Sequence, residues 1–287
     1  MRPPALPPAL CSWTLSDGYE LHGRIWKPTT GRPRGVVLYL HGIQSHGAWF
    51  EWSAARLALT GCVVLLPDRR GSGLNRAARG DVPRAERWLA DLDELADWTA
   101  REFGLERFGV VGVSWGGKPA AWWALRRPER VAQLLLITPG LFPAVDVGLW
   151  QRAKIAASLV FCPAKEFPIP LNDPALFTDN PSGQAFIAND PLKLTRATAR
   201  FLYQSARLDR ILRRARPGSL RPETSLWLAG RERIIRNSPT IAWLTRIAAQ
   251  PAHTDIQATA AHTLEFEPDV EELGERLVVW GNSLNFP

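Results

Sequence analysis

A serine framed by glycines is the residue in this sequence best suited to chemistry. The stretch GVSWGG occupies residues 112 to 117 and follows the apolar run FGVV, so Ser114 lies between a predicted buried strand and a predicted helix. In such a strand, turn and helix the serine sits on a sharp, strained turn, and glycines two positions away on each side prevent collisions with neighbouring backbone. We therefore predict that Ser114 is a nucleophile, lifted above the carboxyl edge of a sheet.

The base and the acid that would activate this serine are predicted from their places in the chain. A serine hydroxyl needs an imidazole to take its proton and a carboxylate to orient that imidazole. Of the five histidines, His262 lies at the very end of the last predicted strand, where the chain reaches the carboxyl edge of the sheet, whereas His253 follows a proline in a predicted loop. We predict His262 as the base.

Glu232 is the predicted acid. It lies just beyond the apolar run TSLWLAG, which reads as a strand ending at the same edge of the sheet. Asp255 is the rival, but it lies at the start of the last predicted strand and would therefore lie at the opposite edge. Asp68, in PDRRGSG, could act as the carboxylate of a dehydrogenase or dehalogenase, and we interpret it as organising a turn with Gly71 and Gly73.

Two backbone N–H groups are needed to stabilise the oxyanion of a tetrahedral intermediate. Trp115 follows the nucleophile at the start of the predicted helix and supplies one of them. Ile43 supplies the other, because Gly42 lets the chain after the strand VVLYL turn toward the serine. His41 and His46, in the same stretch, are interpreted as residues that shape this loop.

Strand and helix signals alternate in the first 138 residues. Continuous apolar runs are typical of strands covered on both faces, as in a parallel sheet, and they lie at 36–40, 62–67, 108–113 and 131–137. Helix-like spacing lies between them at 49–60, 84–103 and 118–128, and residues 20–26 alternate like a half-exposed strand. This order predicts an α/β fold with a doubly wound, mostly parallel sheet.

The alternation stops between residues 139 and 222. This block contains no convincing strand and two helix-like pieces, near 146–161 and 190–216, the second with Asp190 as its predicted N-cap. Strand and helix signals return at 224–230, 238–250 and 255–262, followed by a terminal amphipathic helix. We predict a core formed by residues 1–138 and 223–287 and an inserted helical lid at 139–222.

The charge of the chain is concentrated in the predicted lid. The net charge is +7, and residues 139–221 carry twelve Lys or Arg against six Asp or Glu. Such a surplus forms either a solvated basic face or a surface for anionic lipid or an acidic substrate, so transient contact with an anionic membrane is one expectation. Nucleic acid is not an expected partner, because no nucleic-acid-binding motif accompanies the charge.

The sequence shows no motif of a secreted, membrane-spanning, disulfide-bonded or metal-binding protein. The N-terminal stretch has no apolar core of a signal peptide, and no run approaches the roughly 20 apolar residues of a membrane span, so a cytoplasmic protein is expected. The three cysteines are far apart and form no CxxC pair. No motif predicts a metal ion or a cofactor.

Five motifs together carry a family resemblance: HGIQSH, DRRGSG, GVSWGG, LAGRERII and AHTLEFE, in this order. They resemble the α/β-hydrolase superfamily, in particular its monoacylglycerol lipase and lysophospholipase branch, which overlaps the serine aminopeptidase family. The superfamily's chain order of serine, acid and histidine implies Ser114, Glu232 and His262 as the triad, with Ile43 and Trp115 as the oxyanion donors. Glu232 departs from the usual Asp of this branch, and the bulky Trp115 is expected to narrow the acyl pocket.

The resemblance implies a serine hydrolase that cleaves small-molecule carboxylic esters through an acyl-enzyme, with an acyl-glycerol or a lysophospholipid as the expected substrate. An amidase or aminopeptidase of the same fold is the alternative within enzymes. A protein that only binds a small ligand on this fold is the alternative outside them. The presence of all three triad residues favours an enzyme.

Overall fold

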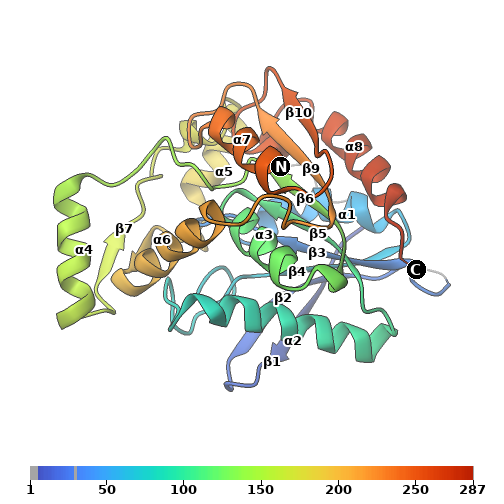
Figure 1. Ribbon diagram of the computed structural model, residues 1–287, viewed down its shortest axis with the longest axis horizontal. Helices are drawn as coiled ribbons and strands as arrows, with labels where there is room; N and C mark the ends of the chain where they lie inside the picture. Colours follow the sequence, from blue (N-terminus) through green and yellow to red (C-terminus); the bar gives the residue numbers. More distant parts are fainter. Residues whose placement is uncertain (1–5, 29–30, 287) are drawn as a thin grey trace.

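The computed structural model describes residues 6–28 and 31–286 and shows one twisted sheet flanked by helices (Figure 1). The sheet has eight strands in the order β1-β2-β4-β3-β5-β6-β9-β10. The six strands from β4 to β10 run parallel, whereas β1 and β2 are antiparallel to their neighbours. The predicted fold class is confirmed. The strands of the sheet are β1 (Ala9–Thr14), β2 (Glu20–Trp26), β3 (Gly35–Leu40), β4 (Cys62–Pro67), β5 (Phe108–Val113), β6 (Val131–Ile137), β9 (Glu223–Ala229) and β10 (His253–Gln257).

Helices cover both faces of this sheet. The helices are α1 (Glu51–Ala58), α2 (Ala85–Phe103), α3 (Gly117–Arg126), α4 (Leu149–Phe161), α5 (Pro181–Asn189), α6 (Ala199–Arg213), α7 (Asn237–Ile247) and α8 (Val270–Ser283). Helices α1 and α8 pack against each other on one face, and α2 and α3 lie together on the other (Figure 1). This division follows from right-handed crossovers, because the chain moves in opposite directions along the sheet from β3 to β4 and from β4 to β5.

The central strands explain why the apolar runs of the sequence fold as they do. Every residue of β3, β4 and β5 is buried, since helices cover both faces of these strands. Parallel strands of one sheet all end at the same edge. The loops after β3, β5, β9 and β10 therefore lie along one edge, and these loops carry Ile43, Ser114, Glu232 and His262.

The predicted lid segment contains more structure than its sequence suggested. Besides α4, α5 and α6 it forms a small antiparallel pair, β7 (Glu166–Pro168) and β8 (Arg196–Thr198). The helix expected from residue 190 begins only at Ala199, where the Thr198 side chain accepts a hydrogen bond from the Phe201 N–H and caps it. Figure 1 shows α4 and β7 at the far left, on the outside of the molecule, with α6 between them and α3.

Two further details differ from the sequence predictions. His253, expected in a loop, opens the last strand β10, which ends at Gln257 and so lies earlier than predicted. Strand β1, at the edge of the sheet, had no predicted counterpart. Within residues 6–28 and 31–286, none of the helices has both the length and the apolar character needed to cross a membrane.

Candidate active site

Ser114 stands on a strained turn directly after β5. Its φ angle is +51°, in the left-handed region that side chains other than glycine rarely adopt, and holding it there costs about 1–3 kcal/mol. A Cβ at Gly112 would lie 2.7 Å from the Ala120 Cβ, and a Cβ at Gly116 would lie 2.2 Å from the Leu40 carbonyl oxygen. Both glycines are therefore required by the crowding around the turn, as the sequence pattern predicted.

The structure brings Ser114, His262 and Glu232 into one hydrogen-bonded chain. The His262 Nε2 lies 2.9 Å from the Ser114 Oγ, and the His262 Nδ1 lies 2.9 Å from each carboxylate oxygen of Glu232. Glu232 also accepts hydrogen bonds from the backbone N–H groups of Ile234, at 2.8 Å, and Ile235, at 3.3 Å. An imidazole that donates from Nδ1 to a carboxylate presents Nε2 as the acceptor for the serine hydroxyl.

The environment of Glu232 keeps this carboxyl ionised. Its side chain is only 3% exposed, and this burial by itself raises its pKa. The charge of His262, the hydrogen bond to it and the two backbone N–H groups outweigh the burial, so the pKa of Glu232 lies below its ordinary value. The longer side chain of glutamate thus fits the position where the monoacylglycerol lipase branch uses aspartate.

The loop that carries His262 is fixed on two sides. The Thr138 hydroxyl, at the end of β6, donates a hydrogen bond of 3.0 Å to the His262 carbonyl, and the Thr263 N–H donates to the Phe177 carbonyl at 2.8 Å. Thr138 itself has a φ angle of +41°. Thr138, like Ser114, thus has a strained backbone and directly contacts the catalytic loops, because its hydroxyl holds the backbone of His262.

The backbone groups predicted as oxyanion donors also meet at Ser114. The loop after β3 passes so close that a Cβ at Gly42 would lie 3.4 Å from the Ser114 Cβ. Ile43, Ser114 and Trp115 line the same cavity, and the Ile43 N–H has no hydrogen-bond acceptor among the described residues. This arrangement leaves a donor available next to the serine.

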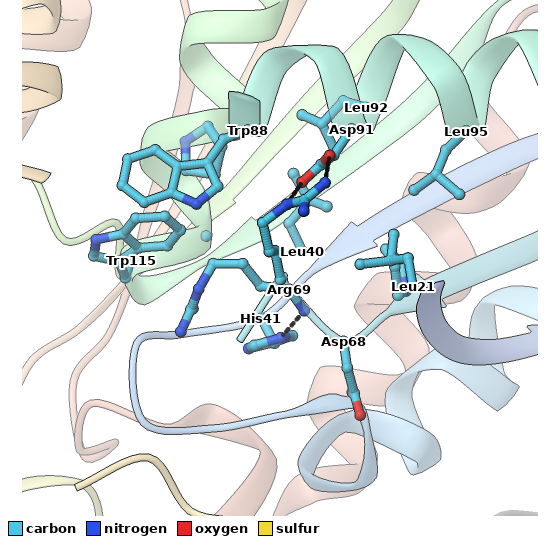
Figure 2. A pocket seen from close by; sticks show the side chains of 14 residues that line it. Leu21, Leu40, His41, Asp68, Arg69, Trp88, Asp91, Leu92, Leu95 and Trp115 are labelled. Carbon is cyan, nitrogen blue, oxygen red and sulfur yellow. Dashed lines mark hydrogen bonds and ion pairs between the residues drawn. The ribbon is translucent and has the colours of Figure 1, made fainter. Parts of the chain in front are cut away.

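Arg69, which follows β4 and was not singled out in the sequence, holds this loop in place. Its guanidinium donates hydrogen bonds to the carbonyls of Gly42, at 2.9 Å, and Ile43, at 3.0 Å, and lies 4.6 Å from the centre of the Trp115 ring. Its backbone N–H donates to the His41 Nε2 at 2.8 Å, as Figure 2 shows. Burial lowers the pKa of Arg69 to about 9. The Arg69 side chain thus contacts both residues that are predicted to supply the oxyanion donors, the Ile43 carbonyl through a hydrogen bond and the Trp115 ring through its guanidinium.

His41 has the loop-shaping place that the sequence predicted. Its Nε2 accepts from the Arg69 N–H, and its Nδ1 lies 2.8 Å from the Gly42 carbonyl. Burial, and next the charge of Arg69, hold the pKa of His41 well below its ordinary value. The Ser72 hydroxyl lies 3.3 Å from the same Nε2 but is fully buried and donates to the Arg69 carbonyl. This second pair of serine and histidine is therefore closed off from any substrate.

Two aspartates hold the far end of the loop. The Asp68 carboxylate accepts a hydrogen bond of 2.6 Å from the Gly47 N–H and one of 2.8 Å from the Leu74 N–H, the second within the turn of Gly71 and Gly73 that it was predicted to organise. Asp190, predicted as a helix cap, accepts a hydrogen bond of 2.9 Å from the Leu192 N–H, but the helix begins only at Ala199. The same carboxylate lies 3.0 Å from the His46 Nε2 and accepts a hydrogen bond of 2.7 Å from the Trp49 indole. The Asp190 contacts tie the loop to the predicted lid segment, and sequence spacing gives no signal for a contact 144 residues apart.

The rival acid and base do not reach the site. Asp255 lies within β10, opposite Trp227, and pairs with Arg276. His253 is exposed at the amino end of the same strand. The structure thus brings Ser114 together with Glu232 and His262, and not with Asp255 or His253.

A cavity of about 540 Å³ opens above Ser114. Its walls come from the loop after β6, from α4 and α6, and from the residues after β7 and Glu232. Most of the wall is apolar and includes Val145, Val147, Ile155, Leu159, Ile169, Leu171, Leu202, Ile234 and Ile235. Trp115 lines the cavity too, with its ring stacked 5.6 Å from Phe201. A much smaller cavity, of about 40 Å³, lies among Trp115, Trp88 and Leu92 (Figure 2).

Comparison with known proteins assigns the chain to a family. The family model described as serine aminopeptidase, S33, matches residues 31–269, which include the nucleophile turn and the loops of Glu232 and His262. The chain belongs to this family. The fold that the resemblance implied, that of an α/β-hydrolase, agrees with this family and with the solved structures that match the chain.

Similar proteins include two that are named monoacylglycerol or monoglyceride lipases. The one from Mycolicibacterium smegmatis is 23% identical over 262 residues, which cover 89% of this chain and 90% of that protein. The soluble variant from Saccharomyces cerevisiae has a structure that matches with a TM-score of 0.84 at 14% identity, covering 100% of both chains. The predicted resemblance to the monoacylglycerol lipase branch is confirmed.

Other curated relatives match over a shorter stretch. A proline iminopeptidase from Clostridium botulinum is 29% identical over 138 residues, which cover 47% of this chain and 44% of that protein. The chain spans between 14% and 46% of the length of four curated relatives of this kind. The activities of these relatives therefore do not pass to this chain by similarity alone.

Replacing the predicted acid tests the hydrogen-bonded chain. Glu232→Gln keeps the shape and removes the charge that orients His262, so kcat for an ester substrate should fall by about 10²–10⁴-fold. Asp255→Asn is the matched control and should change kcat less than about two-fold, because Asp255 contacts Arg276 on the outside of the sheet. The reverse ranking of the two variants in one assay would assign the acid to Asp255.

Replacing Arg69 tests whether its guanidinium holds the oxyanion loop, the loop after β3 that carries Gly42 and the predicted oxyanion donor Ile43. Arg69→Met keeps most of the volume but removes both hydrogen bonds to the loop, so we expect kcat to fall by about 10–100-fold while KM changes little. Arg69→Lys should recover only part of this loss, because an ammonium group lacks the planar fork of donors. Arg101→Met, at an exposed position of α2, is the control. Equal kcat in the Arg69→Met and Arg101→Met variants would show that the loop keeps its place without the guanidinium.

Proposed function

We propose that this protein is a serine hydrolase that cleaves carboxylic esters of the monoacylglycerol or lysophospholipid type through an acyl-enzyme. The observation that carries the proposal is the 2.9 Å contact between the Ser114 Oγ and the His262 Nε2 on the floor of a largely apolar cavity of about 540 Å³. The contact supplies an activated nucleophile, and the cavity supplies room for an acyl chain.

Each residue then has a defined step in the reaction. The His262 Nε2 takes the proton of Ser114 while the Oγ attacks the ester carbonyl, and Glu232 stabilises the imidazolium that forms. The N–H groups of Ile43 and Trp115 bind the oxyanion. The imidazolium protonates the leaving alcohol, and the acyl group remains on Ser114. Water then attacks this acyl-enzyme with His262 again as the base, the bond between the acyl carbon and the Ser114 Oγ breaks, and the carboxylic acid leaves while the imidazolium returns a proton to the serine.

The cavity favours an ester over the substrate of an aminopeptidase. An aminopeptidase must bind a positively charged amino terminus, for which a free carboxylate in the cavity is suited. The two aspartates that line this cavity, Asp146 and Asp209, are each paired with a cation, Arg152 and Lys118. Although one relative is named a proline iminopeptidase, no unpaired carboxylate among the cavity-lining residues is available for that purpose.

We propose that residues 139–222 act as a lid over the acyl chain. Helices α4 and α6 form much of the cavity wall, and they lie in this segment. The segment is anchored to the core by the His46–Asp190 contact and by the hydrogen bond from the Leu194 N–H to the Gln44 carbonyl, at 2.9 Å. The core side of both anchors, Gln44 and His46, belongs to the loop after β3 that also carries Ile43. The proposed lid is therefore attached to the loop that supplies a proposed oxyanion donor.

The same segment supports a proposed contact with an anionic membrane. Leu149, Trp150 and Phe161 of α4 are 82%, 80% and 86% exposed, which is unusual for large apolar side chains. The segment also carries the surplus of basic residues found in the sequence. Apolar side chains combined with basic ones are typical of helices that lie in a membrane interface. Transient docking there would bring the cavity close to its lipid substrate.

The choice of substrate tests the proposed activity. Burial of one CH₂ group is worth about 0.8 kcal/mol, so kcat/KM should rise several-fold for each two carbons from p-nitrophenyl acetate until the apolar wall is filled. A monoacylglycerol should be cleaved faster than a triacylglycerol, and aminoacyl arylamides should be poor substrates. A steady fall of kcat/KM from the acetyl ester upward, or faster cleavage of a proline arylamide than of any ester, would favour the peptidase alternative.

The membrane contact is tested by vesicle sedimentation. The protein should bind vesicles that contain phosphatidylglycerol more strongly than pure phosphatidylcholine vesicles, and added salt should weaken this binding. Leu149→Ala should reduce the bound fraction, whereas Leu59→Ala, an exposed leucine just after α1, should not. Equal binding of the two variants would assign no role to α4.

A further inference from the structure

Helix α6 contributes both apolar and charged residues to the wall of the catalytic cavity. Leu202 and Ser205 line the cavity from the first half of the helix, whereas Asp209, Arg210 and Arg213 line it from the second half. Leu202, Ser205, Asp209 and Arg213 are spaced three or four residues apart, and Arg210 lies three residues before Arg213, so these positions share one broad face of the helix. The cavity wall therefore changes along α6 from apolar to strongly polar.

Lys118 and Asp209 form a balanced pair at the start of this polar region. The Lys118 Nζ lies 2.8 Å from the Asp209 Oδ1 and 3.3 Å from the Ser205 Oγ, and the Lys118 side chain is 8% exposed. The Trp115 indole donates to the same Ser205 Oγ at 2.9 Å. This cluster fixes α6 against the helix that follows the nucleophile. Because Asp209 is neutralised by Lys118, it does not neutralise the arginines beyond it.

Arg210 and Arg213 are left without a carboxylate partner among the described residues. The other carboxylate of the cavity lining, Asp146, pairs with Arg152. The lining thus holds four cationic side chains and two anionic ones, and the two cations in excess are Arg210 and Arg213. A concave site with an excess of one charge attracts ligands of the opposite charge.

The exposed Arg213 side chain contacts the loop after β6 in two ways. It donates a hydrogen bond of 2.9 Å to the Leu141 carbonyl and lies 4.9 Å from the centre of the Phe142 ring. The neighbouring Gly140 N–H donates to the Ser114 carbonyl at 2.7 Å, so the loop that holds Arg213 is attached to the nucleophile turn. An arginine has five N–H donors, and most of those of Arg213 remain available.

We propose that the substrate of this enzyme carries an anionic group, a carboxylate or a phosphate, that Arg210 and Arg213 bind while the ester lies over Ser114. The inference rests on the proposed ester hydrolysis and adds the class of ester. Arginine recognises both kinds of anion through paired N–H donors. The anion can belong to the acyl side, as the free carboxylate of a dicarboxylic half-ester, or to the alcohol side, as the phosphate of an acyl-glycerol phosphate.

Two matched pairs of substrates distinguish these sources. The first pair is p-nitrophenyl octanoate and the mono-p-nitrophenyl ester of octanedioic acid, which differ by a carboxylate at the end of the acyl chain. The second pair is 1-decanoylglycerol and its 3-phosphate, assayed below the concentration at which micelles form. For the correct pair, kcat/KM should be about ten-fold or more higher for the anionic member, the effect of one charge-assisted contact. Raising the NaCl concentration should reduce this ratio.

Variants of the two arginines complete the test. Arg213→Gln and Arg210→Gln should each lower the ratio of anionic to neutral kcat/KM several-fold. Arg214→Gln, at the exposed residue that ends α6 and lies outside the cavity lining, should leave the ratio unchanged. A ratio is independent of the fraction of folded enzyme, so a loss of stability does not imitate this result.

The possible results separate this inference from the proposed function. If neutral esters are cleaved but Arg210→Gln, Arg213→Gln and Arg214→Gln give the same ratio in both substrate pairs, the anion site is wrong and the ester hydrolase stands. If no ester is cleaved, neutral or anionic, the proposed function is wrong and the inference fails with it.

Discussion

The crowded turn after β5 is the constraint on which the rest of the site depends. Ser114 is held at a φ angle of +51°, and the positions two residues before and after it have no room for a side chain. This conformation costs about 1–3 kcal/mol. The surrounding structure offsets the cost, because β5 is a central strand of the parallel sheet and the Gly140 N–H donates a hydrogen bond to the Ser114 carbonyl. The hydroxyl thereby has one fixed position, to which His262 and the loop after β3 are fitted.

Support for the site comes from residues that take no part in the proposed chemistry. Arg69 contacts the carbonyls of the oxyanion loop and the ring of Trp115 at the same time. Thr138 fixes the loop of His262, and Asp190 joins the far end of the oxyanion loop to the predicted lid. A site held in this way needs little rearrangement when charge develops in the transition state, which is the physical basis of electrostatic catalysis. The predicted lid segment is consequently hydrogen-bonded to the loop after β3, which lies next to Ser114.

The sequence predicts the parts of this structure that depend on local patterns. The buried runs of β3, β4 and β5 and the amphipathic helix α2 follow from the periodicity of apolar residues, and the loops at the carboxyl edge follow from the alternation of strand and helix. The proximity of Ser114, Glu232 and His262 was predictable for that reason. Arg69 was not, because its acceptors are carbonyl groups whose directions depend on the final path of the loop. Likewise, Asp190 makes the local contact that its position suggests, with the Leu192 N–H, but the contact of its carboxylate with a buried histidine distant in sequence has no local signal.

The proposed activity requires that Ser114 is the activated nucleophile. The most direct measurement is to treat the protein with a fluorophosphonate, which reacts only with an activated serine, and to locate the adduct by mass spectrometry of the digested protein. The account predicts one adduct per chain, on the peptide that contains Ser114, and none in the Ser114→Ala variant, whose fold should be intact. Equal labelling of the Ser114→Ala variant, or an adduct on Ser45 or Ser72 in the wild-type protein, would contradict it.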